Sequence, residues 1–212
     1  MDRFIQNHKP HWTHRPFLSS VFLGFLLLII SLGIDYNAAM YATRNAGPAV
    51  TDIFLDNVPV MDVDIIFIDG ALIFVLILMA VLLYYPKFIP FVLKSTALFI
   101  MVRSFSITLT HIGLSPQQLP VDVNRFARIF LFQGDLFFSG HTGLPYLMAL
   151  TFWNNKFLRR FFLFASIVAG FSVLLGHLHY SIDVFAAFFI TYGIFHIATR
   201  LFKKDYEYLL KF

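Results

Sequence analysis

Two short polar segments interrupt an otherwise apolar chain: Phe138-Ser-Gly-His-Thr142 and His179-Tyr-Ser-Ile-Asp183. Ionisable side chains at membrane depth are costly and usually functional. His179 and Asp183 are four residues apart, and this spacing places both on one face if the segment is helical. The carboxylate would then hold the proton of one imidazole nitrogen and leave the other as a nucleophile, as in a catalytic triad. A His–Asp pair that only bridges two helices is the structural alternative.

The first segment has the features of an anion-binding helix start. Ser139 can cap the following helix, whose first N–H groups would bind phosphate oxygens. Gly140 lets a bulky anion approach the backbone, and His141 is placed to protonate a leaving oxygen. An ordinary capped helix with an interfacial histidine is the alternative. Taken together, the two segments predict phosphoryl transfer.

A phosphate site also needs fixed positive charge. Arg103 lies within an apolar run, and an intramembrane arginine should face the bundle interior, so we expect it to clamp the phosphate. Snorkelling to the membrane interface is the alternative. Asp135, four residues before Ser139, is expected to bind a cationic headgroup or to orient the loop. Arg125 and Arg128 are weaker candidates that could instead meet lipid headgroups.

The composition is that of an integral membrane protein. The 212 residues are 58% hydrophobic and only 13% charged, whereas roughly a quarter is typical of soluble domains. We expect a single domain over residues 1–212. The chain has no cysteine, which excludes disulfides and thiol catalysis, and its net charge of +4 is too small and dispersed to suggest nucleic acid as a partner.

Apolar runs predict an all-α membrane protein with a six-transmembrane-helix bundle. A span needs about 20 apolar residues. The runs that qualify are 17–34, 65–85, 91–109, 157–175 and 182–202. A shorter sixth run, Thr142–Trp153, begins within the first polar segment, which suggests that this segment is sunk below the membrane surface. Two long outer loops are predicted, over 35–64 and 111–140, and an interfacial helix over 126–132.

The basic residues predict which side each loop occupies. With the N-terminus inside, twelve of the 16 Lys and Arg residues fall on the cytoplasmic side. The other four are Arg44, Arg103, Arg125 and Arg128. Both termini are then cytoplasmic, and both polar segments lie on the extracytoplasmic side, which is periplasmic, exterior or lumenal.

At these residues the chain resembles the type 2 phosphatidic acid phosphatase superfamily, and more closely its sphingomyelin synthase-like branch. Gly134-Asp-Leu-Phe-Phe-Ser-Gly-His-Thr142 is similar to the branch's Gly-Asp-Tyr-Leu-Phe-Ser-Gly-His-Thr, and His179-Tyr-Ser-Ile-Asp-Val184 to its His-Tyr-Thr-x-Asp-Val. The chain lacks the upstream Lys-x6-Arg-Pro segment of the phosphatases. It also has Val173 where they have an arginine six residues before the second histidine.

The resemblance implies that His179 is the nucleophile, that Asp183 orients it and that His141 acts as acid and then base. The implied activity transfers a headgroup from a phospholipid donor to a lipid hydroxyl, such as that of ceramide, through a phosphohistidine. No cofactor and no metal are implied. Hydrolysis of a lipid phosphate or diphosphate is the alternative reaction. A non-enzymatic lipid transporter or scramblase with the same bundle is the alternative from another class.

Overall fold

The computed structural model describes residues 8, 10–118 and 136–211, and these residues form helices and loops with no strand. The long helices are α2 (Arg15–Arg44), α3 (Gly70–Tyr84), α4 (Ile89–Leu109), α6 (Lys156–Leu175) and α7 (Ser181–Leu201). The shorter elements are α5 (Gly140–Thr151), α8 (Lys203–Lys211), the π-helical η1 (Ile65–Asp69) before α3, and the 3-10 helix η2 (Pro86–Phe88) before α4.

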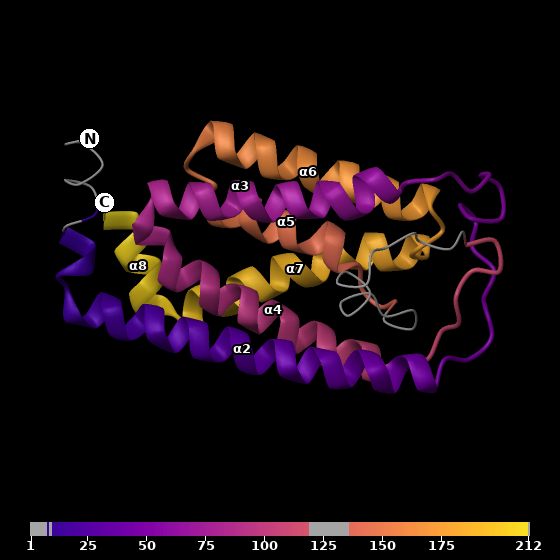
Figure 1. Cartoon of the computed structure of the whole chain (residues 1–212), viewed down its shortest axis with the longest axis horizontal. Helices are drawn as coiled ribbons and strands as arrows, with labels where there is room; N and C mark the ends of the chain where they lie inside the picture. The colour runs from indigo at the N-terminus through magenta and orange to yellow at the C-terminus, as the bar shows by residue number, and fades with distance from the viewer. Residues whose placement is uncertain (1–7, 9, 119–135, 212) are drawn as a thin grey trace.

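Helices α2 to α7 alternate in direction along one long axis (Figure 1). Helix α8 lies at one end, next to the start of α2, and we call this the α8 end. The loops 45–64 and 110–118 and the starts of α5 and α7 lie at the opposite end, which we call the motif end. The bundle therefore brings both polar segments to the same end.

Five helical stretches are long and apolar enough to cross a membrane: Arg15–Arg44, Ile65–Tyr84, Pro86–Leu109, Lys156–Leu175 and Ser181–Leu201. They correspond to the five predicted apolar runs. Many of their large apolar side chains are exposed, and α3 buries only Phe74. Such a surface fits a multi-pass membrane protein, because lipid tails would cover it.

Helix α5 corresponds to the predicted short run, and it is not among the stretches long enough to span. Its 12 residues rise about 18 Å, against roughly 30 Å for the hydrocarbon core of a bilayer. Most of its side chains are buried, and it packs against α4, α6 and α7. Gly143 allows the closest approach, because a Cβ there would lie 2.7 Å from the Phe99 ring of α4 and 2.8 Å from Thr191 Oγ1 of α7.

The predicted first outer loop is wrong at its start. Helix α2 continues to Arg44, well past the predicted end of the span at Ile34, so Asp35 lies in a helix and the loop begins at Asn45. Helix α2 continues because of both packing and helix propensity. Ala38, Ala39 and Ala42 favour the helix, and they form a buried cluster with Ile107 of α4.

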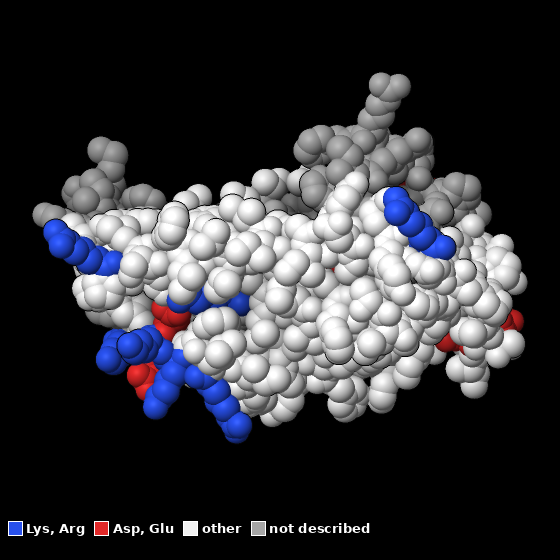
Figure 2. All heavy atoms as spheres, turned by 90° about the horizontal axis from the view of Figure 1, so that it is seen from below, with Lys and Arg blue, Asp and Glu red and all other residues white. Residues whose placement is uncertain are grey.

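A buried ion pair ties α8 to the bundle. Lys94 Nζ lies 2.7 Å from Asp205 Oδ2, and it also donates to Ser20 Oγ of α2. Figure 2 shows that most of the Lys and Arg side chains of that face gather towards the α8 end, where acidic side chains lie among them, while another basic side chain lies near the motif end. The middle of the face is white, as expected where lipid would surround the helices.

Candidate active site

The two polar segments are joined by a direct hydrogen bond at the motif end. Ser139 N donates to Asp183 O at 3.2 Å, which links the residue before α5 to the first turn of α7. Helix α6 also binds the first of these segments, because Ser166 Oγ donates to Thr142 O at 2.7 Å. Three helices thus fix the relative position of the two segments.

Ser139 is the N-cap of α5, as predicted. Its Oγ accepts from Thr142 N at 3.3 Å and from Thr142 Oγ1 at 3.1 Å, and its side chain is fully buried. The cap satisfies one of the first four N–H groups of the helix. The positive end of the α5 dipole therefore lies beside the segment that carries His179.

His179 does not lie on a helix, so the predicted helical i, i+4 geometry is wrong. Helix α7 begins at Ser181, and Tyr180 is its N-cap. Asp183, in the first turn, reaches back instead. Its Oδ2 accepts from Tyr180 N at 3.0 Å and lies 3.5 Å from His179 Nδ1. The two predicted partners thus lie next to each other, at a separation longer than an ideal hydrogen bond.

In the part of the chain that the structure describes, His179 Nδ1 makes no hydrogen bond in this arrangement. A carboxylate only accepts, so a hydrogen bond formed on closer approach to Asp183 would require Nδ1 to carry the proton and would leave the lone pair on Nε2. Asp183 is fully buried, and its Oδ1 has no hydrogen-bond partner within the described ranges. His179 is also buried, at 7% exposed. The arrangement can present one imidazole nitrogen as a nucleophile in a site largely shielded from water.

His141 occupies the first turn of α5 and is half-buried. Its ring stacks on Phe67 of η1, with centroids 4.2 Å apart and an interplanar angle of 27°. Pro145, four residues later, has no N–H, so the carbonyl of His141 lacks the usual helical hydrogen bond. Because Phe67 belongs to the π-helical turn before α3, that turn contributes directly to the placement of His141.

Arg103 lies over the start of α5. The side chain is only 11% exposed, and its Nε donates to Phe138 O at 3.1 Å. Its Nη1 is 3.8 Å from Asp35 Oδ1 of α2. A Cβ at Gly140 would lie 3.2 Å from Arg103 Nε, so the guanidinium and this glycine are in close contact. Arg103 faces the bundle interior, as predicted, and does not snorkel.

Asp135, Arg125, Arg128 and the predicted interfacial helix over 126–132 lie outside the described residues. Two acidic residues near the site were missed by the sequence analysis. Asp35 contacts Arg103 and accepts from Ser104 Oγ at 2.9 Å, and Asp52 binds the start of α7. The only sequence signal for Asp52 is an aspartate at the start of a turn, a position this residue favours.

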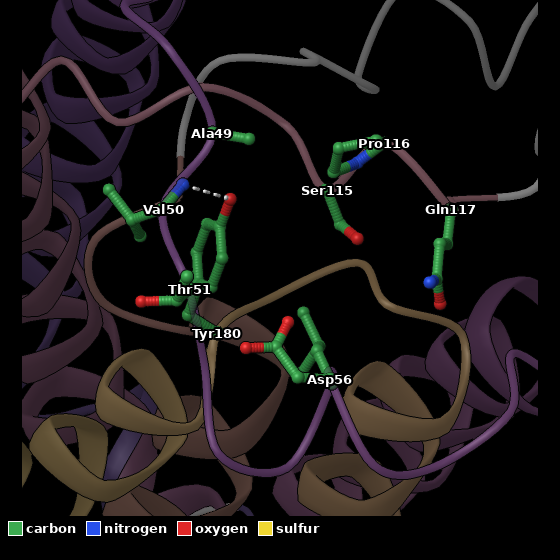
Figure 3. A pocket seen from close by; sticks show the side chains of 9 residues that line it. Ala49, Val50, Thr51, Asp56, Ser115, Pro116, Gln117 and Tyr180 are labelled. Carbon is green, nitrogen blue, oxygen red and sulfur yellow. Dashed lines mark hydrogen bonds between the residues drawn. The ribbon is translucent and has the colours of Figure 1, made fainter.

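A pocket of about 270 Å³ opens at the motif end beside the His179 segment (Figure 3). Loops 45–64 and 110–118 and Tyr180 form its wall. Tyr180 OH donates to Gly113 O at 2.8 Å and accepts from Val50 N at 3.2 Å. The polar lining side chains are Thr51, Asp56, Ser115, Gln117 and Tyr180.

Residues 134–200 match the family model described as PAP2 superfamily C-terminal. The matched range contains both polar segments, and it excludes Arg103 and the loop 45–64. No curated protein and no solved structure matches the chain significantly. The match supports the type 2 phosphatidic acid phosphatase superfamily and, in general terms, a phosphatase or phosphotransferase function on lipids.

Proposed function

We propose that the protein is a lipid headgroup phosphotransferase of the sphingomyelin synthase-like kind, working through a phosphohistidine on His179. The match of residues 134–200 supports phosphoryl chemistry on lipids. The observation that carries the proposal is the joined pair of segments: His179 Nδ1 lies 3.5 Å from a buried carboxylate whose residue is bonded to the cap of α5. This gives a nucleophile and an anion-binding helix start in one place.

In the first step, His179 Nε2 attacks phosphorus of a donor phospholipid. The N–P bond forms as the bond from phosphorus to the diacylglycerol oxygen breaks. His141 protonates that oxygen, and diacylglycerol leaves. Asp183 stabilises the positive charge that develops on the His179 ring, since its Oδ2 lies 3.5 Å from Nδ1.

In the second step, the neutral His141 removes the proton of a lipid hydroxyl, such as that of ceramide. The hydroxyl oxygen attacks phosphorus, the N–P bond breaks, and His179 is regenerated. Arg103 and the first N–H groups of α5 bind the phosphate oxygens in both steps, which need no further cation. Gly140 leaves room for this approach next to the guanidinium.

Hydrolysis is the second candidate, because water could take the place of the lipid hydroxyl in the same second step. The match to a phosphatase superfamily favours it. The departures from the phosphatase pattern, with Val173 as the clearest, favour transfer. On either reading we place the site on the extracytoplasmic side of a six-span bundle, with both termini in the cytoplasm.

The two reactions separate in one assay. Purified protein in liposomes would receive a phospholipid donor labelled in its phosphate, with ceramide or another lipid alcohol as acceptor. We expect a labelled lipid product, and label bound to the protein that is stable to alkali and labile to acid. Release of water-soluble phosphate or headgroup phosphate without any lipid product would replace transfer with hydrolysis.

Histidine substitutions test the assignment of roles in the same assay. His179→Ala should abolish both turnover and protein-bound label, because it removes the nitrogen proposed to form the N–P bond. His196→Ala is the matched control: it removes an exposed histidine from α7, the helix that follows His179, and it should behave like the parent protein. Full turnover by His179→Ala would refute the proposed nucleophile.

A further inference from the structure

The loop 45–64, which we call the anchor loop, binds the segment around His179 along most of its length. The contacts come from residues far apart in sequence. Met61 N donates to Leu175 O at 2.8 Å, and the His177 ring pairs with Val58 O at 3.0 Å. Val50 N donates to Tyr180 OH, a bond drawn in Figure 3. The fourth contact joins Asp52 to Ser181.

Asp52 connects the anchor loop to α7 with both carboxylate oxygens. Its Oδ2 accepts from Ser181 N at 2.8 Å and from Ser181 Oγ at 2.7 Å. Its Oδ1 accepts from Phe54 N at 2.9 Å and Leu55 N at 3.1 Å. The side chain is buried. One carboxylate oxygen closes a turn of the anchor loop, and the other binds the first N–H group of α7.

The carboxylate is ionised at neutral pH. Burial alone would raise the pKa of Asp52, but the hydrogen bonds from Ser181, Leu55 and Phe54 outweigh burial and hold the pKa below its ordinary value. A negative charge at a helix N-terminus also interacts favourably with the helix dipole. Asp52 therefore forms charge-assisted hydrogen bonds, which are about twice as strong as neutral ones.

The segment that Asp52 secures contains strained backbone. His177 is 1% exposed and adopts φ 53°, in the left-handed region that residues other than glycine rarely occupy. Such a conformation persists only where the surroundings hold it in place. Its ring hydrogen bond to Val58 O again comes from the anchor loop. The backbone leading into His179 thus depends on contacts made outside the matched residues 134–200.

We propose that Asp52 is a positioning residue for His179, acting through Ser181 and the start of α7. Asp52 satisfies the N–H of Ser181, and Asp183 Oδ2 is left to bind Tyr180 N and to face His179. Without Asp52, a nearly buried N–H group at the helix start would lose its partner, and the turn that sets the His179–Asp183 separation would relax. The inference rests on the proposed function, in which that separation sets the reactivity of the nucleophile.

The test is Asp52→Asn in the 212-residue chain, with Asp62→Asn as the matched control. Asn has no charge and only one acceptor oxygen, so it cannot accept from both Ser181 and the Phe54 and Leu55 N–H groups. Asp62 is an exposed carboxylate of the same loop that accepts a hydrogen bond from Asp64 N. We expect Asp52→Asn to lower kcat for headgroup transfer, and the single-turnover rate of phosphohistidine formation, by tenfold or more. The KM for the donor lipid should stay within twofold. A loss of folded protein alone would instead lower the active fraction and leave the single-turnover rate unchanged.

Ser181→Ala is the second variant, and it keeps the backbone hydrogen bond while it removes the Oγ contact. We expect a smaller fall in kcat, of about threefold, and less than multiplicative loss when it is combined with Asp52→Asn. If Asp52→Asn does not fold, Ser181→Ala carries the test by itself. Wild-type rates for whichever of these variants fold would overturn the proposal.

Hydrogen–deuterium exchange separates this inference from the proposed function. Asp52→Asn should speed exchange in residues 176–183 by tenfold or more, and Asp62→Asn should not, whether or not the protein turns over any lipid. Faster exchange together with no phosphohistidine in the parent protein would refute the proposed function and keep the positioning role. Unchanged exchange in residues 176–183 would refute the positioning role.

Discussion

Gly140 is the residue that lets Arg103 lie over the start of α5. A Cβ at this position would approach Arg103 Nε to 3.2 Å, closer than ordinary van der Waals contact. Arg103 is itself held from two sides, by Phe138 O and by Asp35. At the scale of single residues, the site therefore combines reactive side chains with a small residue that determines where positive charge can lie.

Gly140→Ala should lower turnover about tenfold while the protein remains folded. The added methyl group would push against the guanidinium and, under the proposed function, would occupy space that a phosphate oxygen needs. The measurement is kcat/KM for lipid transfer, with thermal unfolding of the same samples.

Gly193→Ala is the control for this change, because among the described residues no atom outside its own helix backbone and chain neighbours lies within 4 Å of the Cβ it would add. It should keep activity and stabilise α7 by up to about 1 kcal/mol, the difference between Gly and Ala in a helix interior. Equal activity of Gly140→Ala and Gly193→Ala would contradict the role assigned to Gly140.

Helices at the two ends of the bundle are held by different kinds of contact. At the motif end, backbone groups and short side chains join α5, α6 and α7. At the α8 end, an ion pair joins α8 to α4, with side chains 7% and 12% exposed for Lys94 and Asp205, and the ring of Tyr206 packs against Phe91 of α4. Removal of one member of such a pair leaves the other charge buried without its partner.

Lys94→Met should destabilise the protein by about 3–5 kcal/mol, the usual cost of breaking a buried pair. The double variant Lys94→Met/Asp205→Leu should recover most of this loss, because neither charge then remains. Thermal unfolding in detergent measures both effects. Lys204→Met removes an exposed lysine of α8 and should leave the unfolding temperature unchanged.

The sequence predicted those elements that depend on local pattern. Apolar length located the five long helices, and Ser139 was identified as a cap from residue type alone. The predicted end of α2 was wrong, because Asp35 ends the apolar run while the alanines after it continue the helix. The roles of Asp35 and Asp52 depend on partners far away in the chain, namely Arg103 and Ser181, and no local pattern predicts such pairs.

The anchor loop and α8 lie at opposite ends of the whole molecule. The membrane orientation predicted from the basic residues can therefore be tested by labelling one position at each end. The chain has no cysteine, so one introduced cysteine reports one position. Asn57 and Lys204 are both exposed, the first in the anchor loop and the second in α8.

We expect Asn57→Cys to react with a membrane-impermeant thiol reagent on intact cells, or on right-side-out vesicles. Lys204→Cys should react only after the membrane is opened, because α8 lies at the opposite end and carries the basic residues that favour the cytoplasm. Labelling of both positions from the same side would rule out the proposed arrangement of spans.

The hydrogen bond from Ser139 to Asp183 can form only late in synthesis, after residue 183 has been made. The anchor loop and α5 leave the ribosome long before residues 175–183, to which both must bind. Neither can reach its final contacts until α7 has been inserted beside them. A chain halted after α6 would already contain His141 and Arg103 but would lack His179 and Asp183. Under the proposed function, the nascent chain is therefore inactive towards lipids until its last long helix enters the membrane.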